Sequence, residues 1–224
     1  MPLGRELSLD RLPVDDGADD AELLTRIRAG DRKLFAVLMR RYNQRLYRAV
    51  RAILRQDDEA EDVVQFAYLA AYQNLDQFRG EASFITWLTR IAVHQALARA
   101  RARTRRAEIA VLSSELDVAP ATPEDDASSR ELGRILERQI DALPDLYRSV
   151  FVLRDVEELT TAETAAALGI TEEAVRVRLH RARHLLQNAL VEGIGPASAH
   201  VFRFDGERCD RIILGVLSRL IDSP

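Results

Sequence analysis

The side chains best suited to contact another molecule lie between residues 171 and 184, where basic groups recur with a helical repeat. The apolar residues of this stretch follow the spacing of a buried stripe: Val175, Leu179, Ala182 and Leu186. The opposite face carries Glu173, Val177, His180, Arg181 and His184, with Arg176, Arg178 and Arg183 at its flanks. Guanidinium groups bind phosphates and guanine edges through paired hydrogen bonds. The pattern therefore predicts binding to nucleic acid rather than catalysis.

The residues that precede this face predict how it is positioned. A first helical run, residues 160–168, ends at Gly169, which adopts the left-handed conformation at little steric cost. Thr171 is placed to N-cap the second helix, and Ala165 is small enough to let the two helices cross closely. With an apolar residue at Val175, this spacing predicts a helix-turn-helix that binds DNA. An ordinary helical hairpin with a solvated arginine face is the alternative.

Composition indicates an all-α protein. The chain has 224 residues, of which only 6% are aromatic, and it carries a net charge of −4 at pH 7. Ala, Leu, Arg and Glu are abundant, and all four favour helices. Because Lys33 is the only lysine, nearly every positive group is a guanidinium.

Cysteine usage and hydropathy bear on location. Cys209 is the only cysteine, which excludes an intramolecular disulfide and a cysteine-rich zinc site and indicates the reducing cytoplasm. The chain has no apolar run of roughly 18 residues, so we expect no membrane insertion.

The first half of the chain predicts one small helical domain, residues 20–106, behind a disordered acidic leader, residues 1–19. Gly30 is expected to end a first helix, and Asp31 to cap a second. A third helix is expected from Glu59 to Leu75, with Asp62 and Gln65 one turn apart and directed away from the core. Residues 76–83 form a turn that leaves Phe78 and Arg79 near its tip, before a fourth helix from Phe84.

Arginines gather at the end of that fourth helix. Residues 90–106 contain no acid and six arginines: Arg90, Arg99, Arg101, Arg103, Arg105 and Arg106. Such a series predicts contact with a phosphate backbone or an acidic partner, and a solvated helix face is the alternative.

The second half predicts a flexible acidic linker, residues 107–129, and a second small helical domain, residues 130–192. In that domain a helix stops at Pro144, and another follows over Asp145–Val156, ahead of the helix-turn-helix. The linker acids Glu115, Asp117, Glu124, Asp125 and Asp126 could follow a positively charged channel of a partner or act as a solvated spacer.

Residues 193–224 form a C-terminal extension of unknown role. Residues 200–204 alternate like a strand, and Phe202 and Phe204 are candidate anchors. An amphipathic helix follows, with five apolar residues on one face: Ile212, Ile213, Val216, Leu217 and Leu220. Because an exposed cluster of this kind would be adhesive, we expect the helix to dock. Intramolecular docking that restrains the two domains is favoured over docking on a partner.

Two long blocks resemble a known family. AEDVVQ at residues 60–65 and LDQFRGEASFITWLTRIAV at 75–93, then an acidic linker, then residues 143–183, resemble the sigma-70 superfamily. Within it, the two-domain extracytoplasmic-function (ECF) sigma factors of bacteria are most similar. The resemblance covers about residues 20–106 and 130–190. It implies a bacterial transcription initiation factor that directs RNA polymerase core to specific promoters.

The resemblance also implies partners and residue roles. The partners would be promoter DNA and RNA polymerase core, through its β′ coiled coil and β flap, with an anti-sigma factor as a further candidate. Core binding would involve Asp62, Gln65 and Phe66, where Phe66 replaces the family's usual glutamate. The minus-10 element would be melted and read by Phe78, Arg79, Arg90 and His94, where His94 replaces a common asparagine. The minus-35 element would be read by Thr171, Arg176, Val177, His180 and Arg181.

The residues themselves are consistent with these roles and leave other classes open. Phe78 beside cationic groups suits an extruded base, although it could equally be a core residue, and Trp87 is expected in the core. The sequence shows no catalytic constellation, and we expect neither an enzyme, a metal nor a cofactor. A helix-turn-helix regulator with an unrelated sensor domain and a module that sequesters sigma partners are the alternatives.

Overall fold

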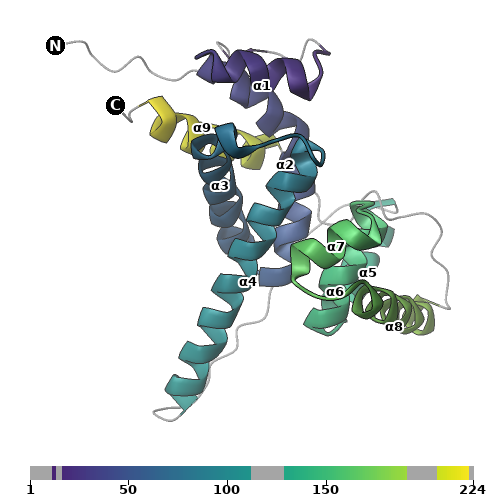
Figure 1. The fold of residues 1–224 in the computed structure, drawn as a ribbon. Helices are drawn as coiled ribbons and strands as arrows, with labels where there is room; N and C mark the ends of the chain where they lie inside the picture. Colours follow the sequence, from purple (N-terminus) through teal and green to yellow (C-terminus); the bar gives the residue numbers. More distant parts are fainter. Residues whose placement is uncertain (1–11, 14–16, 112–128, 191–205, 222–224) are drawn as a thin grey trace.

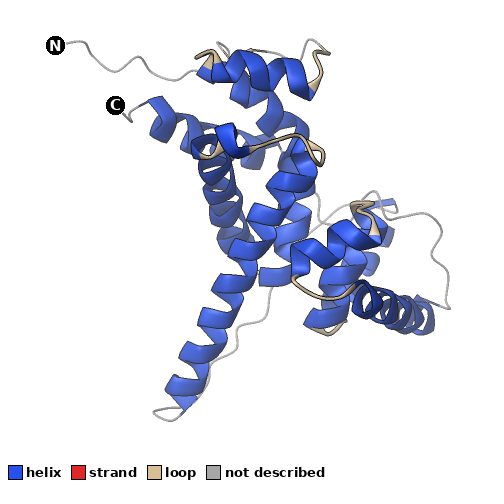
Figure 2. Cartoon of the chain, viewed as in Figure 1, coloured by secondary structure: helices blue, strands red, loops and turns tan. Residues whose placement is uncertain are grey.

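A computed structural model describes residues 12–13, 17–111, 129–190 and 206–221. Every regular element of these residues is helical, and they form two helical domains, as expected (Figure 2). Figure 1 shows the second domain, in green, beside the first. Most of the leader, the linker acids, residues 200–204 and the two candidate anchors Phe202 and Phe204 lie outside the described residues. The leader was expected to be disordered, yet of its described residues Leu12 is buried in the core cluster and the Pro13 carbonyl accepts from Arg40 at 2.6 Å.

Two short elements open the first domain. Helix α1 spans Asp20–Arg28 and begins as predicted, because Asp19 accepts a hydrogen bond from the Glu22 backbone N–H at 2.7 Å. A 3-10 helix, Arg32–Leu34, then leads into α2, Phe35–Leu54. Asp31 precedes this 3-10 helix without a side-chain cap, so the predicted cap is wrong. Its carboxylate lies 4.0 Å from Arg26 instead.

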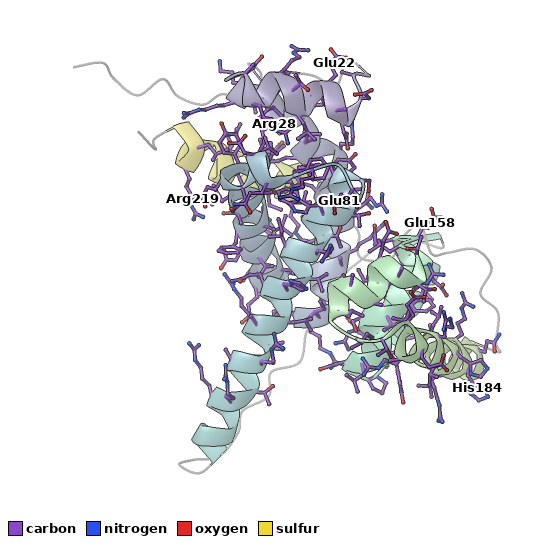
Figure 3. The ribbon with its side chains drawn as sticks, viewed as in Figure 1. Glu22, Arg28, Glu81, Glu158, His184 and Arg219 are labelled. Carbon is purple, nitrogen blue, oxygen red and sulfur yellow. The ribbon has the colours of Figure 1, made fainter. Side chains whose placement is uncertain are left out.

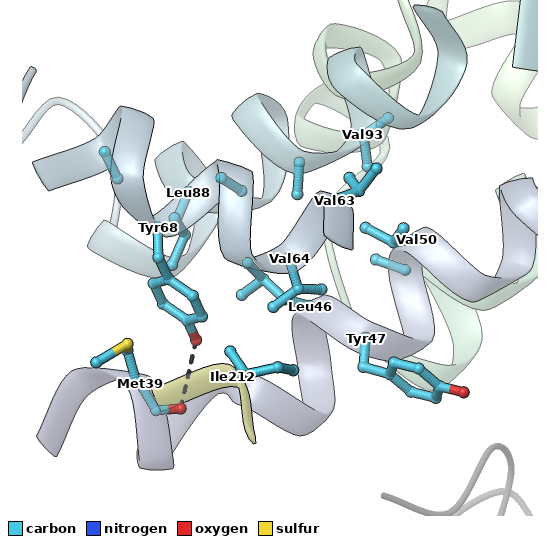
Figure 4. Packing of buried hydrophobic residues seen from close by; sticks show 14 of the residues in the cluster. Met39, Leu46, Tyr47, Val50, Val63, Val64, Tyr68, Leu88, Val93 and Ile212 are labelled. Atoms are coloured by element: carbon cyan, nitrogen blue, oxygen red, sulfur yellow. Dashed lines mark hydrogen bonds between the residues drawn. The ribbon is translucent and has the colours of Figure 1, made fainter. Parts of the chain in front are cut away.

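Helix α3 spans Asp57–Gln73 and α4 spans Phe84–Val111, and both pack on α2 around a buried core (Figure 4). In that core, Tyr68 of α3 donates to the Met39 carbonyl of α2. A 3-10 helix, Leu75–Gln77, follows α3. Helix α4 continues five residues beyond the predicted start of the linker, and its last turns project away from the other described helices (Figure 1).

The second domain contains α5, Ser129–Ala142, α6, Asp145–Phe151, α7, Thr161–Leu168, and α8, Glu172–Leu190. The predicted helix over 145–156 changes character at residue 152, where a π-helical turn, Val152–Val156, continues α6. Its wider pitch is visible in the bond from the Glu157 N–H to the Val152 carbonyl, five residues back.

A buried arginine joins the two domains. Arg148 of α6 is fully buried and donates to the Ala52 carbonyl of α2 at 2.6 Å and to the Leu143 carbonyl at 3.0 Å. The guanidinium also forms an ion pair with the Asp145 carboxylate, at 2.8 Å. Burial lowers the pKa of Arg148, but the guanidinium of an arginine is not deprotonated in proteins, so this buried side chain stays charged.

A buried carboxylate makes a second link between the domains. Glu157 is 3% exposed and accepts a hydrogen bond from Arg45 of α2 at 3.1 Å, while Arg48 lies 3.7 Å from its other oxygen. Burial raises the pKa of Glu157, and the charges of Arg48 and Arg45 oppose that shift. Helix α7 also packs on α4, so the domains meet along two helices of the first domain.

The C-terminal helix α9, Gly206–Ile221, packs on α2, α3 and the 3-10 helix Arg32–Leu34 (Figure 1). Its five predicted apolar residues are all buried: Ile212, Ile213, Val216, Leu217 and Leu220. At about 1.5–3 kcal/mol for each side chain, burial favours docking strongly. The prediction that this helix docks within the chain is confirmed. Its main packing partners all belong to the first domain, so the expected restraint of both domains is not borne out by these contacts.

Candidate nucleic-acid interface and partner-binding face

The helix-turn-helix begins with a capping box. Thr160 accepts from the Glu163 backbone N–H at 3.1 Å, and Glu163 accepts from the Thr160 N–H at 2.8 Å. That backbone hydrogen bond is the main reason why the pKa of Glu163 is lowered. Thr86 of α4 also donates to Glu163, at 2.9 Å, so the same carboxylate ties α7 to the first domain.

The turn has the predicted geometry. Gly169 ends α7 in the left-handed conformation, with φ +66° and ψ 38°, and its N–H donates to the Ala165 carbonyl. Thr171 then caps α8, because its hydroxyl accepts from the Ala174 N–H at 3.2 Å. With this turn and this cap, α8 packs on α7, as the helix-turn-helix spacing predicted, and also on α6.

Helix α8 buries the predicted stripe and leaves the opposite face open. Val175 and Ala182 are fully buried, whereas Val177 is 50% exposed. An open hollow of about 700 Å³ follows the exposed face, and the described residues that line it are Arg176, Val177, His180, Arg181 and His184. Figure 3 shows His184 on the outer side of α8. The residues predicted from spacing are therefore brought together, with Thr171 at the start of the same helix.

The basic side chains on this face differ in their local partners. Arg176 pairs with Glu172 at 3.1 Å and with Glu173 at 3.2 Å, both on its own helix. Such exposed pairs contribute little and can be exchanged for phosphate or a base. The side chains of His180 and Arg181 are exposed and form no hydrogen bond or ion pair with the described part of the chain. Arg183 instead forms an ion pair with Asp155, at 2.8 Å.

The turn that carries Phe78 is braced from two sides. Arg28 of α1 donates to the carbonyls of Leu75 and Phe78, at 2.8 and 2.9 Å. Phe78 is half-buried, with its ring 5.2 Å from Trp87 and 5.7 Å from Phe84. Phe78 thus packs in an aromatic cluster with part of its surface exposed, and its role in binding an extruded base stays a prediction. Trp87, expected in the core, is also half-buried.

Two other predicted residues are exposed near this turn. Arg90 and His94 lie one turn apart on the outer face of α4, and Arg79 is exposed at the tip of the turn. The arginine run beyond them is divided. Arg99 lies 3.6 Å from Asp62 and Arg103 lies 3.2 Å from Glu59, so these two arginines have carboxylate partners on α3.

The three residues of α3 that were predicted to bind polymerase differ in how exposed they are. Asp62 and Phe66 are exposed, and Phe66 is 42% accessible. Gln65 is half-buried beside α9. The next residue, Ala67, is fully buried and faces the core instead.

The described residues contain no group of three or more His, Cys, Asp or Glu side chains that could hold a metal ion. Likewise, none of the described helices is long and apolar enough to cross a membrane.

The fold and the open basic face define a two-domain, all-helical protein with a helix-turn-helix. Comparison with known families agrees: residues 38–106 match sigma-70 region 2, and residues 133–186 match sigma-70 region 4. The chain is 33% identical over 176 residues to the ECF RNA polymerase sigma factor SigW of Bacillus subtilis, covering 75% of this chain and 94% of SigW. It is 35% identical over 182 residues to the ECF RNA polymerase sigma-E factor of Escherichia coli K12, covering 75% and 93%.

A solved structure has the same fold. CnrH, in complex with the cytosolic domain of CnrY, matches with a TM-score of 0.53 and 26% identity, over 78% of this chain and 99% of that chain. The chain belongs to the ECF RNA polymerase sigma factors of the sigma-70 family. It is a transcription initiation factor, which directs RNA polymerase and is not an enzyme.

The residues that connect the two domains were not predicted from the sequence. Arg148 and Glu157 lie in segments that read as ordinary amphipathic helix and loop, and their partners are about 100 residues away in the sequence. A charged residue at a core position of a helical repeat was the available signal. The contact of α9 with Gln65 had no sequence signal other than Gly215 in the middle of an amphipathic helix.

Proposed function

We propose that this sigma factor binds RNA polymerase core with the exposed edge of α3, through Asp62, Gln65 and Phe66, and reads the minus-35 element with α8. The observation that carries the proposal is the open face of α8, on which Arg176, His180 and Arg181 stand together on a capped helix. A recognition helix in this position presents such side chains to base edges in the major groove.

The minus-10 element is assigned to the braced turn and to the adjoining face of α4. The accessible edges of Phe78 and Trp87 offer aromatic surface on which an extruded base can stack. Arg79, Arg90 and His94 lie exposed near it and supply donors for phosphate oxygens. The whole factor acts in the cytoplasm, where polymerase and promoter meet.

Promoter binding requires the two domains to separate. Elements centred about 25 base pairs apart are about 85 Å apart at 3.4 Å per base pair. A compact chain of this length has a radius of gyration of about 17 Å. Both elements can therefore be bound together only after α6 and α7 leave α2 and α4, which breaks the contacts of Arg148, Glu157 and Glu163.

Core polymerase, purified free of other sigma factors, tests the proposal in a promoter-directed transcription assay with the full chain. Asp62→Arg should lower core affinity about tenfold or more, because it reverses the charge of a surface that faces a partner. Glu22→Arg is the matched control, since it makes the same charge change on the exposed face of α1 (Figure 3). Equal core affinity of the two variants would refute the α3 assignment.

The anti-sigma partner expected from the resemblance is a further proposal. The support is that CnrH, which has the same fold, is described in complex with the cytosolic domain of CnrY. Co-purification of a tagged full chain from its own cells, with mass spectrometry of the bound proteins, tests whether such a partner exists.

A further inference from the structure

The C-terminal helix divides the exposed surface of α3 into a covered side and an open side. Glu61 and Gln65, one turn apart, face α9 and are only partly exposed. Asp62 and Phe66 occupy the next positions and are open to solvent. The three residues assigned to core binding therefore straddle the border of α9.

Gly215 brings α9 directly onto the side chain of Gln65. A Cβ atom at Gly215 would lie 2.9 Å from the Gln65 Oε1 and 3.1 Å from its Nε2, which is closer than normal contact. The missing side chain thus permits the approach, in a helix interior where glycine is otherwise unfavourable. With its amide against α9, Gln65 cannot present the whole of its polar group to another protein.

Charged and apolar contacts hold α9 in this position. Glu61 accepts from Arg208 at 2.7 Å and from Arg211 at 2.9 Å, and the Arg208 guanidinium lies 4.5 Å from the centre of the Tyr47 ring. Below these ion pairs, Ile212 enters the core beside Leu46 and Val64 (Figure 4). The ion pairs lie at the edge of the contact, and the apolar residues lie beneath them. We call the ion pairs of Glu61 with Arg208 and Arg211 the latch.

We infer that α9 and RNA polymerase core compete for the Gln65 side of α3, so that α9 must leave this face before the core engages Asp62, Gln65 and Phe66 together. The inference rests on the core contact proposed above. Helix α9 lies outside both segments that match the sigma-70 regions. It is thus an addition to the shared fold that regulates the factor by covering part of its partner-binding surface.

Cys209 provides a direct reporter of α9, because it is the only cysteine of the chain and lies on this helix. Docking keeps it half-buried, with its sulfur accepting from the Asn43 amide at 3.1 Å, and burial raises the pKa of the thiol. The alkylation rate of Cys209, measured by the mass of the sigma chain, should rise when core polymerase is added to the full-length protein. An unchanged or slower rate would overturn the inference, because it would place α9 still docked in the complex.

A charge-swap cycle tests the competition independently. Arg208→Glu with Arg211→Glu weakens the latch and should raise core affinity, by about tenfold if the undocked form is one tenth populated in the wild type. Adding Glu61→Arg restores opposite charges, so the triple variant should bind core more weakly than the double variant. Glu61→Arg alone corrects for the direct effect of that position on core. Arg219→Glu, on the outer side of α9, is the control for charge (Figure 3).

The results separate the two proposals. If core affinity does not rise in the double variant although its Cys209 reacts faster, α9 has been released without effect and the competition is refuted. If Asp62→Arg also leaves core affinity unchanged, the α3 assignment itself fails. A response to Asp62→Arg together with a silent α9 refutes only the competition.

Discussion

Two surfaces of this sigma factor differ in how ready they are for a partner. On α8, four of the five residues assigned to the minus-35 element line one open hollow, and Arg176 among them pairs with acids of the same helix. On α3, the residues assigned to core polymerase are half open and half covered, with Gln65 against Gly215 of α9. The face assigned to DNA is accessible in the isolated chain, whereas the face assigned to polymerase is partly occupied by the chain itself.

The difference shows where control can be applied. On the proposed assignment, α8 needs no rearrangement of the chain before it meets DNA, because its outer face is already open. If α9 competes with core polymerase as inferred, the helix that covers the edge of α3 adds a threshold to core binding. On the proposed mode of promoter binding, the closed packing of the two domains adds another threshold, because both elements can be reached only after it opens.

The largest effect is expected on the open surface. Arg176→Ala with Arg181→Ala removes two guanidinium groups that nothing else in the described part of the chain replaces on that face. One bidentate base contact contributes about 1–3 kcal/mol, so promoter affinity should fall by about 5- to 150-fold if one of the two arginines makes such a contact, and by more if both do. Competition binding of the polymerase complex to promoter fragments measures it, with Arg26→Ala on α1 as control. Unchanged affinity would mean that α8 is not the recognition helix.

A second effect concerns the packing of the domains. Arg148→Met keeps an unbranched, largely apolar stem but removes the donors to the Ala52 and Leu143 carbonyls, at roughly 1–3 kcal/mol for each buried acceptor. The domains should separate more readily, with a lower Tm and a larger radius of gyration in X-ray scattering. Duplex binding by α8 should stay the same, because its face is open in either state. A Tm equal to that of Arg26→Met would contradict this use of Arg148.

The surface around Phe78 lies between the two extremes, since it is half-buried and partly accessible. Phe78→Ala removes the stacking edge, which is worth about 1–3 kcal/mol for a base. Open-complex formation, followed by permanganate reactivity of melted thymines, should fall while closed-complex binding is retained. Loss of both to the same extent would instead assign Phe78 to the stability of the fold.

The smallest effect is a pH dependence of domain packing. Because burial raises the pKa of Glu157, its contribution favours the packed state fully below the ordinary Glu pKa and is lost as pH rises through the raised value. Glu157→Gln cannot titrate. The Tm of the wild type relative to this variant should therefore decrease as pH rises from about 4 to about 8. The same Tm difference at both ends would show that Glu157 does not titrate in this range.

The sequence predicted the parts of this molecule that depend on local patterns. The Gly169 turn, the Thr171 cap and the exposed face of α8 follow from helical spacing and capping chemistry, and the structure has all three. The docking of α9 followed from its apolar face. Its docking place did not, because Gly215 and Glu61 meet their partners only through tertiary packing. The arginine run was similarly ambiguous, since no local pattern distinguishes Arg99, paired with α3, from Arg90, which is exposed.

Hydrogen–deuterium exchange of the full chain, alone and bound to core polymerase, tests the central contrast most directly. On core binding, amides of α3 around residues 61–66 should exchange more slowly while those of α9 exchange faster. Subsequent addition of promoter DNA should slow exchange in the first turns of α8. Slower exchange of α9 together with α3 would contradict the account, because it would make the C-terminal helix part of the polymerase interface rather than its competitor.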